Sequence, residues 1–257
     1  MSNQKNKYSI PILKRSLAVI ELINSAENGL SSGELENLIS IPRSSMFRIL
    51  NTLVEAKWLQ KQYNRYLPGS RMIQSGMLAL SRIELRRVAI PFMNELTRET
   101  SETSHMGILS GTDILIVEVC DGPKHIYIAS RPGLLLHPHC SSIGKVILAF
   151  CVDDIEAFFK GKVLEKRTPA AITDYDALRQ ELETVRKKGY GFDNTEYYKD
   201  VRCLAAPICD RHGIDVGAIG ITATSLSFKK EMETDMAVIV KRYADKISSA
   251  IGMTKEP

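Results

Sequence analysis

The chain has 257 residues, of which 44% are hydrophobic and 25% are charged, as in an ordinary globular protein with one large domain or two smaller ones. This composition excludes collagen-like, low-complexity and disordered chains. The formal net charge is +4, and the whole excess lies in residues 1–70, which contain nine basic and five acidic residues. A basic segment joined to a neutral one predicts a module that binds a polyanion and a second module with another role.

The remaining composition indicates a cytoplasmic protein. No run of ~18 apolar residues predicts a membrane span, and Lys14, Arg15 and Glu21 interrupt the first apolar stretch, which is untypical of a signal peptide. The five cysteines are irregularly spaced and include no CxxC pair. They therefore predict neither a disulfide framework nor a zinc ribbon.

Two helices are predicted before residue 40. Apolar residues recur at helical spacing over 13–23, behind Pro11, which suits the first turn of a helix. A second, short helix begins at Ser31, where Glu34 stands at the position that completes a capping box.

A third helix follows a tight turn. Pro42 disfavours helix at the residue before it but fits a first helical turn, and apolar residues recur over 46–53. A short helix, a tight turn and a longer helix predict a helix-turn-helix. The polar face of the third helix carries side chains that suit base edges and phosphates in the major groove: Arg43, Ser44, Ser45, Phe47, Arg48 and Asn51.

The run 58–67 alternates loosely around a turn near Tyr63-Asn64, which predicts a β-hairpin wing. This wing would bring Lys61 and Arg65 toward the DNA backbone. The alternative is that the basic residues form only a solvated surface. The order of the helices, the position of the proline and the charge favour DNA binding.

Residues 69–85 predict a linker helix whose apolar face is broader than contact with the wing requires. Proteins of this kind usually read two half-sites as dimers. We therefore expect the linker to pack against its counterpart in a second chain; packing against the chain's own domains is the alternative.

The rest of the chain predicts an α+β domain. Two strand pairs resemble hairpins, with turns at 110–113 and 210–213, which favours an antiparallel sheet with flanking helices. Strands are expected at 104–110, 114–120, 125–130, 190–194, 201–209 and 215–222. Helices are expected at 87–101, 141–150, 152–160, 174–188 and 229–250.

Three segments resemble the IclR family of bacterial transcriptional regulators. They are VRCLAAPICDRHGIDVGAIGIT at 201–222, LLLHPHCSSIGKVILAF at 134–150 and IPRSSMFRILNTL at 41–53. The resemblance implies a winged helix-turn-helix (1–68), a linker helix (69–85) and a GAF-like effector and oligomerisation domain (86–257). It also implies a homodimer or tetramer that binds double-stranded operator DNA and responds to a small metabolite, without enzymatic activity, cofactor or membrane partner.

The predicted start of a helix at 141 offers backbone N–H groups beside apolar residues, which favours a carboxylate or phosphate ligand. The resemblance implies that the effector contacts Leu136, Ser142, Ile143, Asp193, Cys203, Gly220 and Thr222. Cys203 and Thr222 also fall on neighbouring predicted strands, where they share a face. The family commonly has serine where this chain has Gly220 and proline where it has His137, so a roomier pocket is expected at Gly220.

A metal site is one alternative for the segment 137–140, because His137, His139 and Cys140 are usable zinc ligands. A closed site needs a fourth ligand, for which His105, His125 and His212 are candidates. The sequence alone leaves this open, as it leaves open a thiol- or metal-based sensor on the same DNA-binding module.

An enzyme with Cys203 as nucleophile is the other alternative. A reactive thiolate needs a base or a positive field, and the sequence places neither beside Cys203. The chain also has no GxSxG, P-loop, GxGxxG or HExxH motif. We therefore expect a regulator that needs no cofactor.

Overall fold

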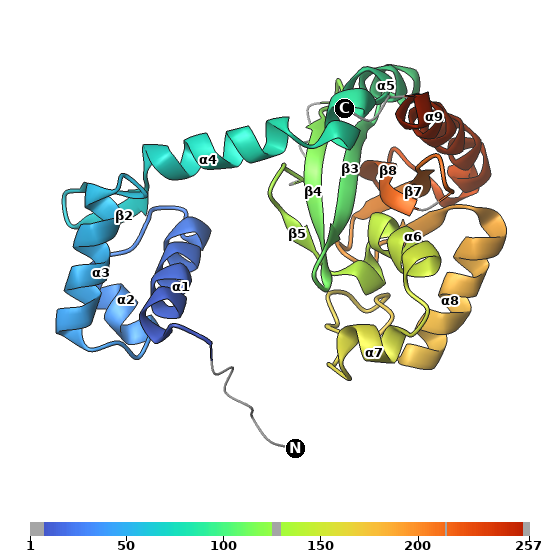
Figure 1. Cartoon of the computed structure of the whole chain (residues 1–257). Coiled ribbons are helices and arrows are strands. Elements are labelled where there is room, and N and C mark those ends of the chain that lie inside the picture. The colour runs from blue at the N-terminus through green and yellow to red at the C-terminus, as the bar shows by residue number, and fades with distance from the viewer. Residues whose placement is uncertain (1–7, 125–129, 214, 254–257) are drawn as a thin grey trace. The chain divides into compact units, whose positions relative to one another are not determined.

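The computed structural model describes residues 8–124, 130–213 and 215–253. The chain divides into two compact units, residues 1–82 and 83–257, each with its own hydrophobic core (Figure 1). The fold is α+β, with a helix-turn-helix unit followed by a unit built on an antiparallel sheet. No helix in the described part of the chain is long and apolar enough to cross a membrane.

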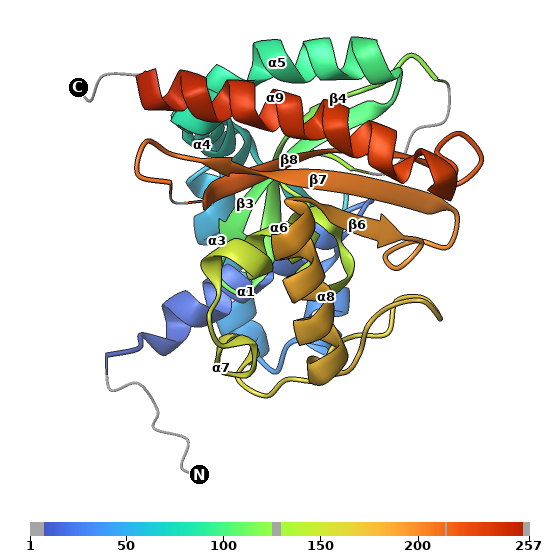
Figure 2. The ribbon, with the colours of Figure 1, turned by 90° about the vertical axis from the view of Figure 1, so that its right-hand side faces the viewer.

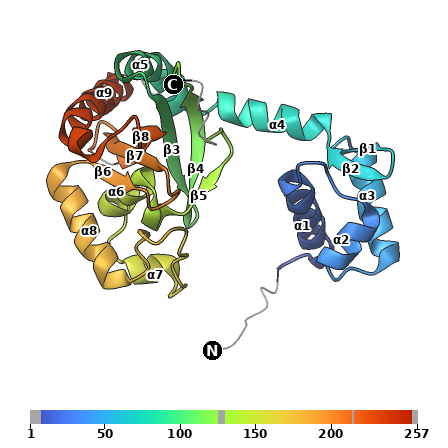
Figure 3. The same cartoon turned by 180° about the vertical axis from the view of Figure 1, so that it is seen from behind.

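The first unit contains three helices, a two-stranded hairpin and a further helix (Figure 3). These elements are α1 (Pro11–Ser25), α2 (Ser32–Leu38), α3 (Arg43–Glu55), β1 (Leu59–Gln62), β2 (Arg65–Pro68) and α4 (Ser70–Ser81). The predicted capping box forms at the start of α2, because Ser31 accepts the N–H of Glu34 and Glu34 accepts the N–H of Ser31. Pro42 is the residue before the first turn of α3, one position earlier than expected.

Every element of this unit contributes to one apolar core, with α4 adding only the partly buried Met72. The core residues are Val19, Ile23, Leu35, Ile41, Met46, Ile49, Leu50, Leu59 and Tyr66. The spacing of Met46, Ile49 and Leu50 turns one face of α3 inward, and its opposite face is left to solvent. The hairpin is joined to the helices by a β-bridge between Leu30 and Tyr66.

The second unit has a six-stranded antiparallel sheet in the order β5-β4-β3-β8-β7-β6. Its strands are β3 (Thr103–Ser110), β4 (Asp113–Cys120), β5 (Leu135–Leu136), β6 (Gly191–Asn194), β7 (Val201–Cys209) and β8 (Asp215–Thr224). Its helices are α5 (Glu84–Thr100), α6 (Ser142–Cys151), α7 (Ile155–Phe159), α8 (Tyr175–Lys188) and α9 (Glu233–Met253), with 3₁₀ turns at Pro138–Cys140 and Lys230–Met232. Figure 2 shows α5 and α9 on one face of the sheet and α6 and α8 on the other.

The elements follow the sequence pattern with local differences. Both predicted hairpins form. The expected linker helix 69–85 ends at Ser81, and a new helix begins at Glu84. The two-residue strand β5 was not predicted, because it is too short to show a period. Of the expected strand 125–130, residues 125–129 lie outside the described residues.

Candidate functional site

The outer face of α3 presents the side chains that the sequence assigns to DNA, which are polar apart from Phe47. Arg43, Ser44, Phe47, Arg48 and Asn51 are exposed, and Ser45 is half-buried. The side chain of Arg43 is 90% exposed, with Glu36 at 3.8 Å. A pair this exposed contributes little binding energy, so the guanidinium can still reach a phosphate or a base.

The two basic residues of the wing have different surroundings. Lys61 is exposed, with Nζ 5.4 Å from the centre of the Tyr66 ring. Arg65 instead donates hydrogen bonds to the carbonyl oxygens of Asn28 and Gly29 and to Glu34 at 3.1 Å. Arg65 thus uses Nε and Nη2 for contacts within the unit, while its side chain remains 43% exposed.

The Glu34 carboxylate attracts Arg65 because it stays ionised. Hydrogen bonds from the backbone N–H and the hydroxyl of Ser31, followed by Arg65, lower the pKa of Glu34 to about 2. The capping box was visible in the sequence, but its contact with Arg65 spans 31 residues. No local pattern predicts a pairing over that distance, which is why the sequence assigned Arg65 to DNA.

The second unit contains a narrow cavity of about 20 Å³, room for about one water molecule, between the start of α6 and the sheet. Its lining residues are His105, Ser130, Leu136, Ser141, Ser142, Ile143, Asp193, Tyr197, Tyr198, Val201, Cys203 and Thr222. Six of the seven residues expected at the effector site are among them, and Gly220 is not. His105, Ser130, Ser141, Tyr197, Tyr198 and Val201 were not predicted from the sequence as lining residues.

Gly220 lies within β8, between His105 on β3 and Ala205 on β7. A Cβ atom at this position would lie 2.4 Å from the carbonyl oxygen of Leu204 and 2.9 Å from Cβ of Ala205. The glycine therefore allows close approach of β7 and β8 here. It does not contribute the extra cavity space that the sequence comparison suggested.

One wall of the cavity is a row of polar residues on adjacent strands. Asp193 on β6 pairs with Cys203 on β7, which pairs with Thr222 on β8. The Cys203 thiol donates to Oγ1 of Thr222 at 3.1 Å. Burial, and then the charge of Asp193, raise the pKa of Cys203 well above its usual value. The group at neutral pH is a thiol, which is a poor nucleophile.

Asp193 connects this wall to the turn that follows β6. Its Oδ1 accepts the backbone N–H groups of Glu196 at 2.7 Å and Tyr197 at 3.3 Å. Burial, followed by the nearby charge of Glu196, raises the pKa of Asp193 to about 7. Its carboxyl group therefore exchanges a proton near neutral pH and is able to donate a hydrogen bond when protonated.

The opposite wall is the N-terminus of α6. Ser141 caps this helix: its hydroxyl accepts the N–H of Gly144 at 3.2 Å and donates to the carbonyl oxygen of His137. Within the described chain, the backbone N–H groups of Ser142 and Ile143 have no acceptor. Free N–H groups at the positive end of a helix dipole attract an anion.

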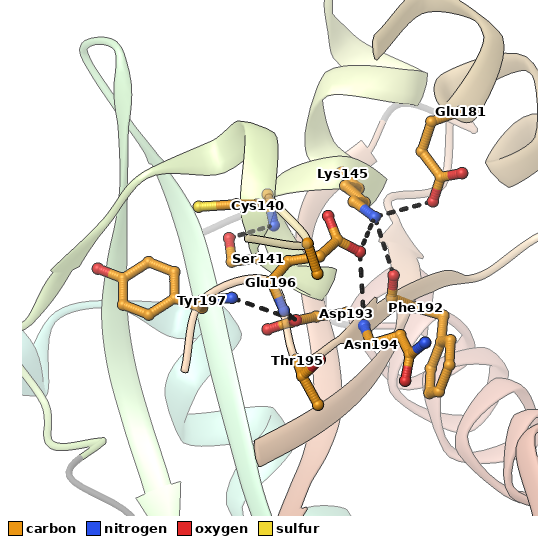
Figure 4. A network of polar contacts seen from close by, with 12 residues as sticks. Cys140, Ser141, Lys145, Glu181, Phe192, Asp193, Asn194, Thr195, Glu196 and Tyr197 are labelled. Carbon is orange, nitrogen blue, oxygen red and sulfur yellow. Dashed lines mark hydrogen bonds and ion pairs between the residues drawn. The ribbon is translucent and has the colours of Figure 1, made fainter. Parts of the chain in front are cut away.

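A buried ion-pair network lies directly behind the cavity (Figure 4). Nζ of Lys145 donates to Glu196 at 2.6 Å, to Glu181 at 2.9 Å and to the carbonyl oxygen of Phe192 at 3.0 Å. Burial would lower the pKa of Lys145, but Glu196 and Glu181 outweigh it and raise that pKa. Lys145 is therefore charged, and it joins α6, α8 and the turn after β6.

The segment 137–140 is held by protein contacts. Nε2 of His137 lies 3.0 Å from the Glu165 carboxylate, and Nε2 of His139 lies 2.9 Å from the Glu165 carbonyl oxygen. Burial raises the pKa of Cys140 to about 12. No group of three or more potential metal ligands occurs in the described ranges, and His125, one candidate fourth ligand, lies outside them.

A larger cleft of about 860 Å³ lies elsewhere in this unit, bordered by Leu85, Leu109 and Phe150. It is open to solvent and its lining is mainly apolar. It contains none of the expected effector residues, and none of its described lining residues is a buried polar side chain without a partner. The smaller cavity therefore has the better chemistry for a polar ligand.

Replacing Asp193 with Asn is expected to flatten the dependence of stability on pH. A folded-state pKa of about 7 lies above the unfolded value of ~3.9, so the folded protein holds the proton more tightly. The stabilisation is complete below about pH 4 and is lost as the pH rises through about 7. Asn does not ionise, so the melting temperature of the variant should fall less between pH 5 and pH 8.

Thermal unfolding of the full chain at pH 5, 6, 7 and 8 measures this effect. Asp154→Asn is the control, because Asp154 caps α7 at an exposed site and asparagine is an equally good cap. The control should keep the wild-type pH profile. Identical profiles for Asp193→Asn and the wild type would show that Asp193 does not take up a proton in the folded protein.

Comparison with known proteins identifies the same two parts. Residues 12–62 match the IclR helix-turn-helix domain, and residues 77–249 match the C-terminal domain of the bacterial transcriptional regulator IclR. The HTH-type transcriptional regulator KdgR of Escherichia coli strain K12 is 30% identical over 227 residues, which cover 87% of this chain and 86% of KdgR.

Solved structures have the same fold. The IclR protein of Thermotoga maritima is 26% identical, with a TM-score of 0.75, over 95% of this chain and 100% of that one. An IclR homologue from Microbacterium hydrocarbonoxydans, solved in complex with 4-hydroxybenzoate, is 21% identical, with a TM-score of 0.82 over the same shares. Since the C-terminal family model alone covers more than half of the sequence, the chain belongs to the IclR family of bacterial transcriptional regulators.

Proposed function

We propose that this regulator binds operator DNA with its first unit and a small organic carboxylate in the cavity of its second unit. The main support is that residues from separate segments, each expected at an effector site, line one cavity: Leu136, Ser142, Ile143, Asp193, Cys203 and Thr222. The homologue with bound 4-hydroxybenzoate shows that the fold accommodates an organic acid.

The carboxylate of the effector binds at the N-terminus of α6. The free N–H groups of Ser142 and Ile143 support this placement, as does the apolar wall formed by Leu136. No arginine or lysine is among the described residues that line the cavity. The helix N-terminus therefore balances the negative charge of the effector carboxylate. Protonation of Asp193 removes a second negative charge that would repel it.

Two or more chains act together on a pseudo-palindromic operator. The apolar residues Ile73, Met77 and Leu78 of α4 are each more than half exposed, and α4 buries none of its residues. An uncovered apolar helix face suits pairing with the same helix of a second chain. We assign residues 1–68 to DNA binding, 69–85 to the linker and 86–257 to effector binding and oligomerisation, in a cytoplasmic homodimer or tetramer.

The protein is a switch rather than an enzyme. Cys203, the one candidate nucleophile from the sequence, is half-buried; the pKa of its thiol lies well above the usual value, so the thiol is protonated, and it donates to the hydroxyl of Thr222. The effector acts by favouring one arrangement of the DNA-binding units over another. Known relatives of the chain are transcriptional regulators.

Selection from a random library of double-stranded DNA tests the proposed function. The full-length protein should enrich a two-fold symmetric sequence, and its affinity should fall steeply as salt increases, because phosphate contacts release counterions. Enrichment of no sequence would contradict the proposal. A parallel thermal-shift screen of small organic acids should reveal the class of effector through stabilisation of the folded chain.

Replacing Arg48 with Ala should weaken operator binding by about 1–3 kcal/mol and broaden the sequence preference, if the side chain reads a base. Arg48 is exposed on the outer face of α3. Equilibrium binding to the selected operator and to single-base variants measures both effects. Arg98→Ala is the control, because Arg98 is an exposed arginine of α5 in the second unit; it should change neither the affinity nor the sequence preference. If Arg48→Ala lowered the affinity equally for all sequences, Arg48 would contact only phosphate.

A further inference from the structure

His105 is a buried polar side chain without a hydrogen-bond partner. It lies on β3 and is 3% exposed, and its side chain borders the cavity. Among the residues that the structure describes, neither Nδ1 nor Nε2 has a partner. More than nine in ten buried polar groups in proteins are hydrogen-bonded, and an unpaired one reduces stability. Such a side chain beside a cavity indicates that its partner is a ligand.

The neighbours of His105 on the sheet explain why the described part of the chain offers it no partner. Directly across the sheet, Gly220 has no side chain. The next residue on that face of β8, Thr222, accepts the thiol hydrogen of Cys203 and makes no hydrogen bond to the ring of His105. Both ring nitrogens therefore remain available to a molecule in the cavity.

The charge state of His105 restricts the chemistry of that molecule. Burial lowers the pKa of His105 to about 4, so the ring is neutral at pH 7. A neutral imidazole has one donor nitrogen and one acceptor nitrogen. It does not supply a positive charge for a carboxylate, but it suits a carbonyl or hydroxyl oxygen.

The cavity thus offers two different polar sites. The free N–H groups of Ser142 and Ile143 at the start of α6 suit an anionic carboxylate. His105 projects from the sheet, which forms another wall. A ligand that satisfies both sites carries a carboxylate and a second oxygen group.

We propose that His105 binds the effector through this second oxygen, so that the pocket selects a small hydroxy or oxo carboxylic acid over the acid that lacks the extra oxygen. This inference rests on the proposed function, because it takes the carboxylate to bind at α6. His105 is then a specificity-determining residue. Its unpaired ring lowers the stability of the free protein in exchange for selectivity.

A first experiment needs no ligand. His105→Leu removes two unpaired polar atoms from a buried site, so the melting temperature of the free full-length protein should rise. His139→Leu is the matched control, because His139 is equally buried but is hydrogen-bonded to the Glu165 carbonyl oxygen; this variant should melt at a lower temperature. An unchanged or lower melting temperature for His105→Leu would overturn the proposal, since it would show that the ring is already satisfied.

A second experiment measures selectivity with matched acids. Propionate, lactate and pyruvate form one series, and benzoate and 4-hydroxybenzoate form another; within each, only the second oxygen differs. For the wild-type protein, calorimetry should give about tenfold tighter binding of an oxygenated acid than of its parent in at least one series. His105→Leu should reduce that preference to less than about threefold, and His105→Gln, which keeps a donor and an acceptor, should retain part of it.

The outcomes separate the inference from the proposed function. Equal affinities for the parent and oxygenated acids, or an unchanged preference in His105→Leu, would overturn the role of His105 while leaving a carboxylate pocket. Binding of none of the acids would overturn the proposed carboxylate class, and the inference with it. Loss of operator recognition in the wild-type protein would refute the proposed function as a regulator, independently of the calorimetry.

Discussion

Replacing Lys145 with Met is expected to lower the free energy of unfolding by about 3–5 kcal/mol, because it leaves a buried charge without its partner. The Lys145 side chain is 1% exposed and the Glu196 side chain is 9% exposed. Oε2 of Glu196 already has no hydrogen-bond partner. Removal of the ammonium group would leave the Glu196 carboxylate with one long hydrogen bond, from the backbone N–H of Asn194 at 3.4 Å, and no positive partner.

The loss should also reach the effector cavity. Glu196 donates its backbone N–H to Asp193 and accepts from Lys145 through its side chain, as Figure 4 shows. Without Lys145, the turn that orients Asp193 loses its anchor on α6. The variant should therefore bind the effector more weakly, and hydrogen exchange of α6 and α8 should accelerate.

Urea unfolding of the full chain, with hydrogen exchange for each segment, measures both effects. Lys188→Met is the matched control, because Lys188 pairs with Glu233 at 3.0 Å but is about half exposed; such a pair contributes about 0–1 kcal/mol. Adding Glu196→Gln to Lys145→Met should recover part of the loss, because it removes the uncompensated charge. A loss no larger than that of the control would contradict the buried ion pair.

The first unit was predictable because its elements are determined by local chemistry. The capping box of Ser31 and Glu34, the turn at Pro42 and the apolar spacing of α3 all act within a few residues of each other. Family resemblance indicated six residues that line the cavity, and strand alternation predicted that Cys203 and Thr222 share a face. These signals were enough to predict the fold and half of the residues that line the cavity.

The missed residues depend on contacts between distant segments. The pair formed by Lys145 and Glu196 spans 51 residues, and the one clue in the sequence was a lysine within an otherwise apolar helix. The expectation of space at Gly220 considered only that glycine has no side chain. It did not take into account that the adjacent strand β7 fills the space that a side chain would occupy. His105 gave no signal, because a histidine on a strand is unremarkable until its neighbours are known.

Replacing Gly144 with Ala is the second large effect that we expect, with a loss of stability of about 3 kcal/mol from overpacking. Gly144 stands in the first turn of α6, where alanine would ordinarily favour the helix. A Cβ atom there would lie 2.2 Å from Cα of Pro138 and 2.3 Å from its carbonyl oxygen. Both atoms belong to the backbone, so no side-chain rotation relieves the clash.

The clash has to move either the 138–140 turn or the start of α6. The Ser141 cap joins these two segments, and the free N–H groups of Ser142 and Ile143 lie at the start of α6. Effector binding should therefore fall together with stability. Gly33→Ala in α2 is the control: nothing lies within 4 Å of its added Cβ, and the change should stabilise the protein by about 0.4–1 kcal/mol. If Gly144→Ala instead proved as stable as the control and still bound the effector, α6 would not pack on Pro138 in this way, and the cavity would lose the wall on which its carboxylate site depends.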